Sequence, residues 1–294
     1  MKLNDRQKGM LDGSEGEAKA FAMRVITQLG DVFGAQELMP VSQVHVDGCC
    51  YQTAGDAGLD FAEKLASLGG KVVVPTTTNV SGRDIRRWRE HGFTESLAEK
   101  NRRMEKAYMK MGAIPTWTCA PYMQGPVPRF GEQIVWAESN AIAFVNSVIG
   151  ARTHRYGDFI DACCAVTGCT PKFGLHLEEN RRPGLVVDVT GFGKVPSDDT
   201  SFYASLGYWL GITSEGTIPY LCGLPLDVTS DCLKALCAAG AASGSLALFH
   251  AEGITPEADQ YKSNVDDGHV KGHFSFGPSE LDASRAELNT ATSN

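Results

Sequence analysis

The sequence has 294 residues, 43% hydrophobic and 21% charged, which is typical of a folded globular protein with one large or two ordinary domains. Its formal net charge is −8 and it has no long basic run, which argues against nucleic acid or an anionic membrane surface as a partner. The first residues lack the apolar core of a signal peptide, and no stretch approaches the roughly 18 apolar residues of a membrane span.

In the first half of the chain, helices are predicted at residues 4–10, 15–29, 53–68, 82–91, 94–111, 136–148 and 158–167. Strands are predicted at residues 38–46, 71–75 and 113–117. In the second half, strands are predicted at 185–189, 218–221 and 245–250, helices at 200–210 and 231–239, and a helix-prone tail at 279–294. This alternation predicts an α/β fold with largely parallel sheets and right-handed crossovers. A division after residue 167 would give two α/β units, 1–167 and 168–294, the second incomplete at its C-terminus.

The chain contains nine cysteines. Because the number is odd and no export signal is expected, they are interpreted as reduced thiols in a cytoplasmic protein. No C-x-x-C pair is present, which argues against a zinc ribbon or a thioredoxin-like site.

Three predicted strands are followed by polar or glycine-containing loops: HVDGCCY, PTTTNVSGRD and TCAPY. In a parallel sheet these loops lie at one edge and can converge on one crevice. Two interpretations stay open for Thr76–Asn79, a helix cap or a set of donors for carboxylate or phosphate oxygens. His45 and Asp47 are either an acid–base pair or buried strand residues. His176, close to Glu178, is either a site residue or part of a surface ion-pair cluster.

Cys119 lies in the third of these loops, between Thr118 and the Ala-Pro-Tyr run, and a Gly-Pro-Val-Pro run follows. Most cysteines outside disulfides are buried and inert, which is the simplest interpretation. A thiolate on a rigid loop at the end of a strand can instead bind iron or attack an electrophile. The sequence supplies no histidine paired with Cys119, which argues against a thiol nucleophile.

Four segments in order carry a resemblance: HVDGCCY, VPTTTNVSGRD, MGAIPTWTCAPY with the following GPVPRFGEQIVWAESNAIAFVNSVIGART, and TGCTPKFGLHLEENR. Together they resemble the large-subunit part of aconitase X. The resemblance implies aconitase-like α/β/α layers and an iron–sulfur-dependent dehydratase. It implies that Cys119 is one cluster ligand, and that the cluster is 2Fe–2S or 4Fe–4S.

The same resemblance implies that two loops contact the substrate. The first consists of Gly48, Cys49 and Cys50, and the second contributes Thr76, Thr77, Asn79 and Val80. Archaeal members of the family resemble mevalonate 5-phosphate dehydratases and tend to have proline where this chain has Val80. Bacterial members resemble cis-3-hydroxy-L-proline dehydratases, which form pyrroline-2-carboxylate, and this is the predicted substrate.

The sequence departs from the family in length. The Gly-Cys-Pro-His motif and the later cysteine that supply the other cluster ligands are absent, as is the small swivelling domain or subunit. The sequence assigns no catalytic base. The chain is therefore predicted to be a fragment that is inactive without the missing C-terminal part. The alternative is a non-catalytic scaffold that contributes one ligand and part of a cleft to a second polypeptide.

Overall fold

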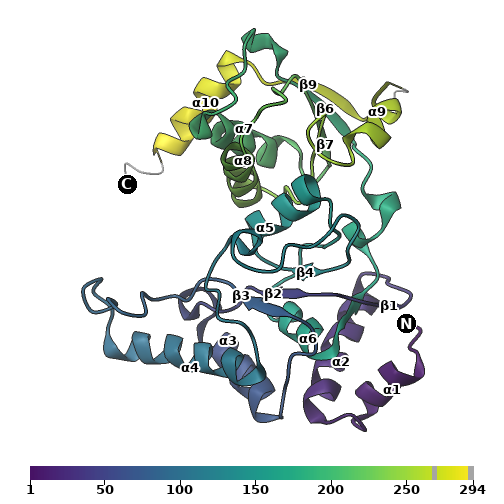
Figure 1. Ribbon diagram of the computed structural model, residues 1–294, viewed down its shortest axis with the longest axis vertical. Coiled ribbons are helices and arrows are strands. Elements are labelled where there is room, and N and C mark those ends of the chain that lie inside the picture. The colour runs from purple at the N-terminus through teal and green to yellow at the C-terminus, as the bar shows by residue number, and fades with distance from the viewer. Residues whose placement is uncertain (267–269, 291–294) are drawn as a thin grey trace. The chain divides into compact units, whose positions relative to one another are not determined.

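The computed structural model describes residues 1–266 and 270–290, which form two compact units (Figure 1). The first unit comprises Met1–Pro128, Glu132–Glu138 and Arg152–Leu177. The second comprises Arg129–Gly131, Ser139–Ala151 and Glu178–Asn294. Each unit is thus built from three separate stretches of the chain. The predicted division into folding units after residue 167 stays a prediction.

A three-stranded parallel sheet forms the centre of the first unit, with the order β3-β2-β4. Its strands are β2 (Val44–Val46), β3 (Thr76–Thr78) and β4 (Val135–Trp136). A separate antiparallel pair joins β1 (Leu38–Pro40) to β5 (Cys169–Pro171). The helices are α1 (Asp5–Asp12), α2 (Glu17–Val32), α3 (Tyr51–Ser67), α4 (Glu95–Met111) and α6 (Ile160–Thr167), with single 3₁₀ turns at Pro121–Met123 and Gly174–His176.

The second unit is built on a four-stranded parallel sheet with the order β8-β7-β6-β9. Its strands are β6 (Leu185–Asp188), β7 (Pro219–Cys222), β8 (His250–Ala251) and β9 (Gly272–Ser275). Its helices are α5 (Ser139–Phe144), α7 (Thr200–Thr213), α8 (Ser230–Ser243), α9 (Ala258–Asp266) and α10 (Pro278–Thr290). A π-helix at Val145–Ile149 continues α5, and 3₁₀ turns lie at Glu178–Asn180 and Thr190–Phe192. The prediction of an α/β fold with largely parallel sheets is confirmed.

Local sequence signals explain where the long helices begin and end. Asn4 and Gln7 form a reciprocal capping box at the start of α1. The Thr94 side chain accepts a hydrogen bond from the Leu97 amide at the start of α4, and Gly112 ends that helix in the left-handed conformation. These caps satisfy backbone groups at the helix ends that have no partner within the helix.

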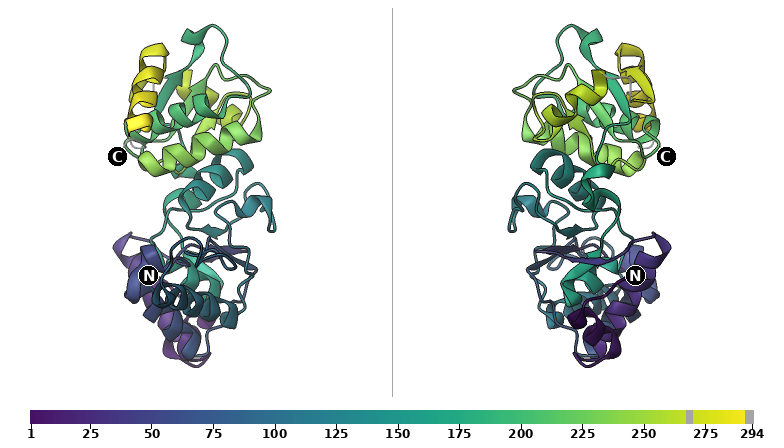
Figure 2. Two further views of the ribbon diagram at one scale, coloured as in Figure 1. Left: turned by 90° about the vertical axis from the view of Figure 1, so that its left-hand side faces the viewer. Right: turned by 90° about the vertical axis from the view of Figure 1, so that its right-hand side faces the viewer.

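Close contact between backbones distinguishes the helix pair α7 and α8 of the second unit, which lie side by side in Figures 1 and 2. A Cβ atom added at Gly207 would lie 2.2 Å from the Leu236 carbonyl oxygen, and one added at Gly211 would lie 2.4 Å from that of Gly240. Only glycine leaves room for this approach. The glycines in these segments therefore explain why the two helices can pack so closely.

Two predicted elements differ from the structure near the strand ends of the first unit. The strand predicted at 71–75 lies instead at Thr76–Thr78, because β2 pairs with these three threonines while the Val73 amide bonds to the Ala165 carbonyl oxygen. The helix predicted at 82–91 is a series of turns. The Asp84 carboxylate accepts hydrogen bonds from the amides of Arg86 and Arg87, both 2.7 Å, but the backbone bonds that follow include short-range turn bonds, such as that of the Glu90 amide to the Arg87 carbonyl oxygen (2.9 Å).

Three further predicted elements also differ from the structure. The segment 113–117 forms only an isolated bridge, between Ile114 and Thr77, and not a strand. The helix predicted at 136–148 divides into the end of β4, α5 and the π-helix. The strand predicted at 245–250 is reduced to His250–Ala251. Residues 291–294 of the predicted tail lie outside the described residues.

Candidate functional site

The ends of β2 and β3 bring the first two predicted loops together. The Asn79 amide donates to the Val46 carbonyl oxygen (2.8 Å), which continues the ladder one residue beyond β3. The Asn79 side chain then donates through Nδ2 to Oδ1 of Asp47 and accepts at Oδ1 from the Val80 amide. One Nδ2 hydrogen of Asn79 remains for a further acceptor.

His45 is buried within β2, and its Nδ1 lies 2.8 Å from Oγ1 of Thr77 on the neighbouring strand. Burial lowers the pKa of His45 to about 3, against a smaller opposing effect of the Thr118 backbone. The imidazole is therefore neutral at ordinary pH. Its recorded partner is a threonine and not Asp47, so the structure supports the buried-strand interpretation and assigns His45 to orienting Thr77.

Asp47 lies half-buried just past β2, and burial raises the pKa of its carboxyl group. Its backbone amide donates to Oδ2 of Asp161 (2.5 Å), while Oδ1 of Asp161 accepts from the Ala162 amide (2.6 Å). Asp161 is fully buried, and burial raises the pKa of its carboxyl group to about 8. Asp161 thus holds the start of the first loop through its hydrogen bond to the Asp47 amide.

The Gly48–Cys50 loop is packed closely against helix α4 and the residue before α6. A Cβ atom on Gly48 would lie 2.9 Å from the Phe159 ring and 3.6 Å from the Tyr108 hydroxyl, so a larger residue would force the Phe159 ring to shift. Cys49 is fully buried, and burial raises the pKa of its thiol well above the usual range. Cys50 is half-buried, with Sγ 3.5 Å from Oε1 of Gln52.

The segment called the Thr76–Val80 loop, which includes β3 and the two residues after it, contains side chains of very different accessibility. Thr76 and Thr77 are 1% and 4% exposed, and Thr76 Oγ1 donates to the Val74 carbonyl oxygen (2.9 Å). Asn79 is 7% exposed, whereas Val80 is 42% exposed. Among these four predicted residues, Val80 therefore presents the largest part of its side chain to a ligand.

A buried ion pair anchors the continuation of this loop. Arg83 Nη2 lies 2.6 Å from the Glu105 carboxylate of α4, and the side chains of both residues are 6% exposed. Ser81 also donates to the Glu105 carboxylate. Neither Arg83 nor Glu105 was singled out from the sequence. Ser81 and Arg83 lie 24 and 22 positions before Glu105, so no local pattern connects them.

Cys119 lies on the third loop and has an exposed side chain. The loop begins with Trp117, whose φ of 46° is rare for a residue with a side chain. It continues with Ala120 N donating to Thr118 Oγ1 (3.0 Å) and ends in the 3₁₀ turn Pro121–Met123. The Thr118 amide donates to the Thr78 carbonyl oxygen (3.3 Å), so this loop leaves the sheet beside the Thr76–Val80 loop.

His176 is not part of a surface ion-pair cluster. It is 2% exposed, its Nε2 lies 2.5 Å from the Tyr156 hydroxyl and its Nδ1 lies 2.7 Å from Oε1 of Gln133. Burial also holds the Tyr156 hydroxyl protonated, since it raises the pKa of that group. His176 thus belongs to a buried polar network of the core, and its interpretation as part of a surface cluster is wrong.

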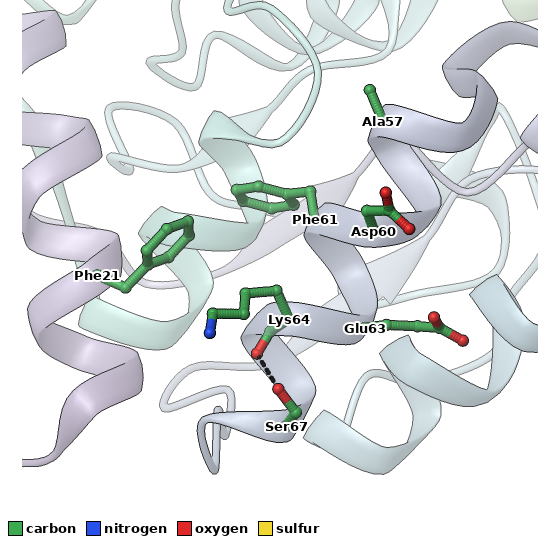
Figure 3. Close-up of a pocket in the computed structure, with 7 residues that line it drawn as sticks. All are labelled: Phe21, Ala57, Asp60, Phe61, Glu63, Lys64 and Ser67. Atoms are coloured by element: carbon green, nitrogen blue, oxygen red, sulfur yellow. Dashed lines mark hydrogen bonds between the residues drawn. The ribbon is translucent and has the colours of Figure 1, made fainter.

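A surface depression between α2 and α3 is separate from the three loops (Figure 3). Phe21 and Phe61 face each other there, with ring centroids 5.7 Å apart. Ser67 Oγ donates to the Lys64 carbonyl oxygen (2.8 Å) at its end. None of the predicted site residues lines this depression.

The cysteines differ in their fitness to hold an iron–sulfur cluster, which requires deprotonated thiolates. Burial raises the pKa of five thiols: Cys49, Cys163, Cys164, Cys169 and Cys237. In residues 1–266 and 270–290, no three His, Cys, Asp or Glu side chains are placed to share a metal ion. The exposed Cys119 fits one ligand position, and a cluster there would require further ligands from another segment or chain.

The fold and this polar edge define an α/β protein with a candidate small-molecule site at the carboxyl ends of parallel strands. Residues 1–179 match the family "Aconitase X first domain", and residues 183–286 match "Aconitase X second domain". The chain therefore belongs to the aconitase X family, which confirms the resemblance predicted from the sequence.

Two curated relatives cover nearly the whole chain. The chain is 43% identical over 291 residues to a cis-3-hydroxy-L-proline dehydratase of Pseudomonas aeruginosa, covering 99% of this chain and 49% of that protein. It is 40% identical over 298 residues to a phosphomevalonate dehydratase large subunit of Methanocaldococcus jannaschii, covering 99% of this chain and 72% of that protein. The chain thus spans about half the length of the first relative.

A solved structure agrees with the fold. The holo-form aconitase X of Thermococcus kodakaraensis superposes with a TM-score of 0.87 at 36% sequence identity, covering 98% of this chain and 69% of that one. Separately, in the part of the chain that the structure describes, no helix is long and apolar enough to cross a bilayer.

Proposed function

We propose that this chain is the Cys119-bearing part of an iron–sulfur-dependent hydro-lyase that dehydrates cis-3-hydroxy-L-proline. The observation that carries the proposal is the exposed Cys119 thiol on a loop bonded to the Thr76–Val80 loop through Thr118 and Thr78. The family assignment adds support, because relatives that cover the chain almost completely are named as dehydratases. The catalytic base stays unassigned.

The reaction requires a Lewis acid as well as fixed hydrogen-bond donors. Loss of a β-hydroxyl group expels hydroxide, a poor leaving group, and a cluster iron with an open coordination position would stabilise it. Removal of the α-proton builds negative charge on the substrate carboxylate, which fixed donors stabilise. The remaining Nδ2 hydrogen of Asn79 is one such donor.

Thr77 is the second donor, and His45 controls it. If the His45 Nδ1–H donates to Thr77 Oγ1, the Thr77 hydroxyl hydrogen is left for the substrate carboxylate. The neutral imidazole donates in this way as its Nδ1–H tautomer, in which Nε2 carries no proton. Thr76 is the weaker donor, since its hydroxyl hydrogen already bonds to Val74.

Charge near the end of β2 favours hydroxyproline over a phosphorylated substrate. Asp47 lies within electrostatic range of Asp158, Asp161 and Arg155. Three carboxyl groups and one guanidinium group therefore surround the end of β2. This local excess of negative charge attracts the secondary ammonium group of an imino acid and repels a phosphate monoester.

Mevalonate 5-phosphate remains the second candidate substrate, because a large-subunit relative named for that activity covers this chain equally well. That name also supports a partner of the small-subunit type, with which the chain would complete the site. If no such partner restores turnover, the chain is a scaffold that contributes one ligand.

The test is anaerobic purification of the chain, alone and together with the remaining part found in its longer relatives. We expect bound iron and acid-labile sulfide only in the combined sample, and dehydration of cis-3-hydroxy-L-proline with at least about 100-fold higher kcat/KM than mevalonate 5-phosphate. A higher kcat/KM for mevalonate 5-phosphate would instead identify that compound as the substrate. Absence of iron from both samples would refute the cluster and return Cys119 to a scaffold or thiol role.

A further inference from the structure

On its outer side the edge strand β3 pairs with the segment 114–118 partly through backbone bonds and partly through one side chain. Thr116 Oγ1 donates to the Thr78 carbonyl oxygen (2.9 Å) and accepts from the Thr78 amide (3.1 Å). One hydroxyl group thus occupies both backbone positions that a neighbouring strand would pair. Thr78 is fully buried, so without Thr116 its amide would lose this partner, whereas its carbonyl oxygen would keep the Thr118 amide (3.3 Å).

The Thr78 side chain in turn both donates to and accepts from backbone groups of the segment that contains Thr116. Its Oγ1 donates to the Ile114 carbonyl oxygen (3.2 Å) and accepts from the Trp117 amide (3.4 Å). Thr78 and Thr116 therefore form a reciprocal threonine pair, in which each hydroxyl donates once and accepts once across the gap between two segments 38 residues apart.

This pair explains how the chain can turn away from the sheet at Trp117. A residue with a side chain is strained at a φ of 46°, and such a conformation persists only when its surroundings hold it. The Trp117 amide is held by Thr78 Oγ1 and the next amide, that of Thr118, by the Thr78 carbonyl oxygen. Cys119 follows immediately, at the point where the chain becomes exposed.

We propose that Thr78 and Thr116 are positioning residues that set the place of Cys119 relative to the Thr76–Val80 loop. The role of Cys119 as a metal ligand rests on the proposed function, whereas the positioning itself rests on the hydrogen bonds alone. Thr78 joins the two loops because it is the last residue of β3 and the partner of Thr116. From the sequence, Thr78 was considered only as part of the Thr76–Asn79 run and Thr116 was not singled out, because each is one of several threonines in its segment.

The experiment compares Thr78→Val and Thr116→Val, which remove the hydroxyl group at nearly constant volume, with Thr78→Ser and Thr116→Ser, which keep it. Thr167→Val is the matched control, because Thr167 is 2% exposed and its hydroxyl bonds within α6 to the Cys163 carbonyl oxygen (2.8 Å). Amide hydrogen exchange of residues 117–125 and the rate of Cys119 alkylation by iodoacetamide are measured on the whole chain by peptide mass spectrometry.

Each valine variant removes two hydrogen bonds between the segments, so we expect it to increase amide exchange at 117–118 by at least about 5-fold, the effect of a single lost bond, and to change the alkylation rate of Cys119 by a similar factor. The serine variants should restore both rates, and Thr167→Val should change neither. Equal rates in the valine variants and the control would overturn the inference. If a valine variant does not fold, the serine variant of the same position decides: loosening of 117–118 despite its hydroxyl group would contradict the inference.

Iron retention in the completed enzyme separates this inference from the proposed function. If Cys119→Ser keeps its iron, the proposed function fails, while the exchange and alkylation rates still decide the positioning role. If Cys119→Ser loses iron, the valine variants should lose iron faster than wild type and the serine variants should not. Normal retention in the valine variants would then overturn the positioning role.

Discussion

The strand ends of the two units use polar residues in opposite ways. At the end of β2 in the first unit, Asp47 bonds through its side chain to Asn79, 32 residues away, and through its amide to Asp161, 114 residues away. At the end of β6 in the second unit, Asp188 bonds to the amide of Thr190, two residues away (2.7 Å). Both sheets are parallel, so topology alone does not distinguish a site from a loop cap.

The electrostatic consequences follow the same division. Burial raises the pKa of Asp47 and Asp161, whereas hydrogen bonds from Thr190 lower the pKa of Asp188. The first edge therefore holds carboxyl groups whose ionisation is unfavourable, a common property of functional sites. Both units also contain a buried ion pair, and that of the second unit is the more deeply buried, with Arg181 Nη2 2.5 Å from the Glu257 carboxylate and both side chains almost fully buried. This comparison can be tested on each side.

The largest effect on folding is expected in the second unit. Glu257→Gln would leave the Arg181 guanidinium buried without its counter-charge, and should lower the free energy of unfolding by about 3–5 kcal/mol. Urea denaturation measures this loss. The double variant Arg181→Met with Glu257→Leu should recover part of it, because no unpaired charge then remains. A loss below about 1 kcal/mol in the single variant would contradict the structural role of the pair.

The largest effect on chemistry is expected in the first unit. Cys119→Ser in the completed enzyme should abolish stable iron binding and lower kcat/KM by more than the roughly 10–100-fold typical of residues that only support a ligand. Cys222→Ser is the control, because Cys222 ends a strand of the other sheet and is half-buried. Iron content per chain and turnover are measured together. Iron loss in both variants would show that the effect is not specific to the first edge.

Asp161 should give the first unit a distinctive pH dependence. Because its folded pKa is about 8 and its ordinary value is 3.8, its contribution to stability is complete below about pH 4 and is lost as the pH rises towards 8. The free energy of unfolding should therefore fall between pH 5 and 8, with a slope of at most about 1.4 kcal/mol per pH unit from this group. In Asp161→Asn the slope should be smaller, although overall stability is lower.

Asp188→Asn is the control for that slope. The pKa of Asp188 is lowered, so its contribution is present above its ordinary pKa and is lost only in acid, as the pH falls through the lowered value. Its replacement should leave the pH 5–8 slope unchanged. An equal change of slope in both variants would remove the distinction between the two edges.

The smallest effect is expected for Asp188→Ala. It removes one exposed hydrogen bond within a loop and should cost about 1 kcal/mol of stability without altering iron binding or turnover of the completed enzyme. Thermal unfolding and the dehydration assay measure the two properties. A marked loss of turnover would indicate that the end of β6 also contributes to the reaction.

The family, the parallel α/β architecture and the segments that form the polar edge could be predicted from the amino-acid sequence alone. These depend on long local motifs and on the alternation of apolar strands with capped helices, which are readable without tertiary contacts. The glycine and proline pattern after Cys119 also indicated a loop correctly, since neither residue favours continued helix. The functional roles of Cys119 and of the two substrate loops stay predictions.

Tertiary structure decided the states of the side chains and the register at that edge. Nothing local distinguishes buried Cys49 from exposed Cys119, or shows that His45 is neutral, because burial depends on segments far away in the sequence. The same holds for β3, whose three threonines pair with β2 in place of the more apolar segment before them. Pairing partners set strand register, and the reciprocal threonine pair arises only when residues 38 positions apart meet.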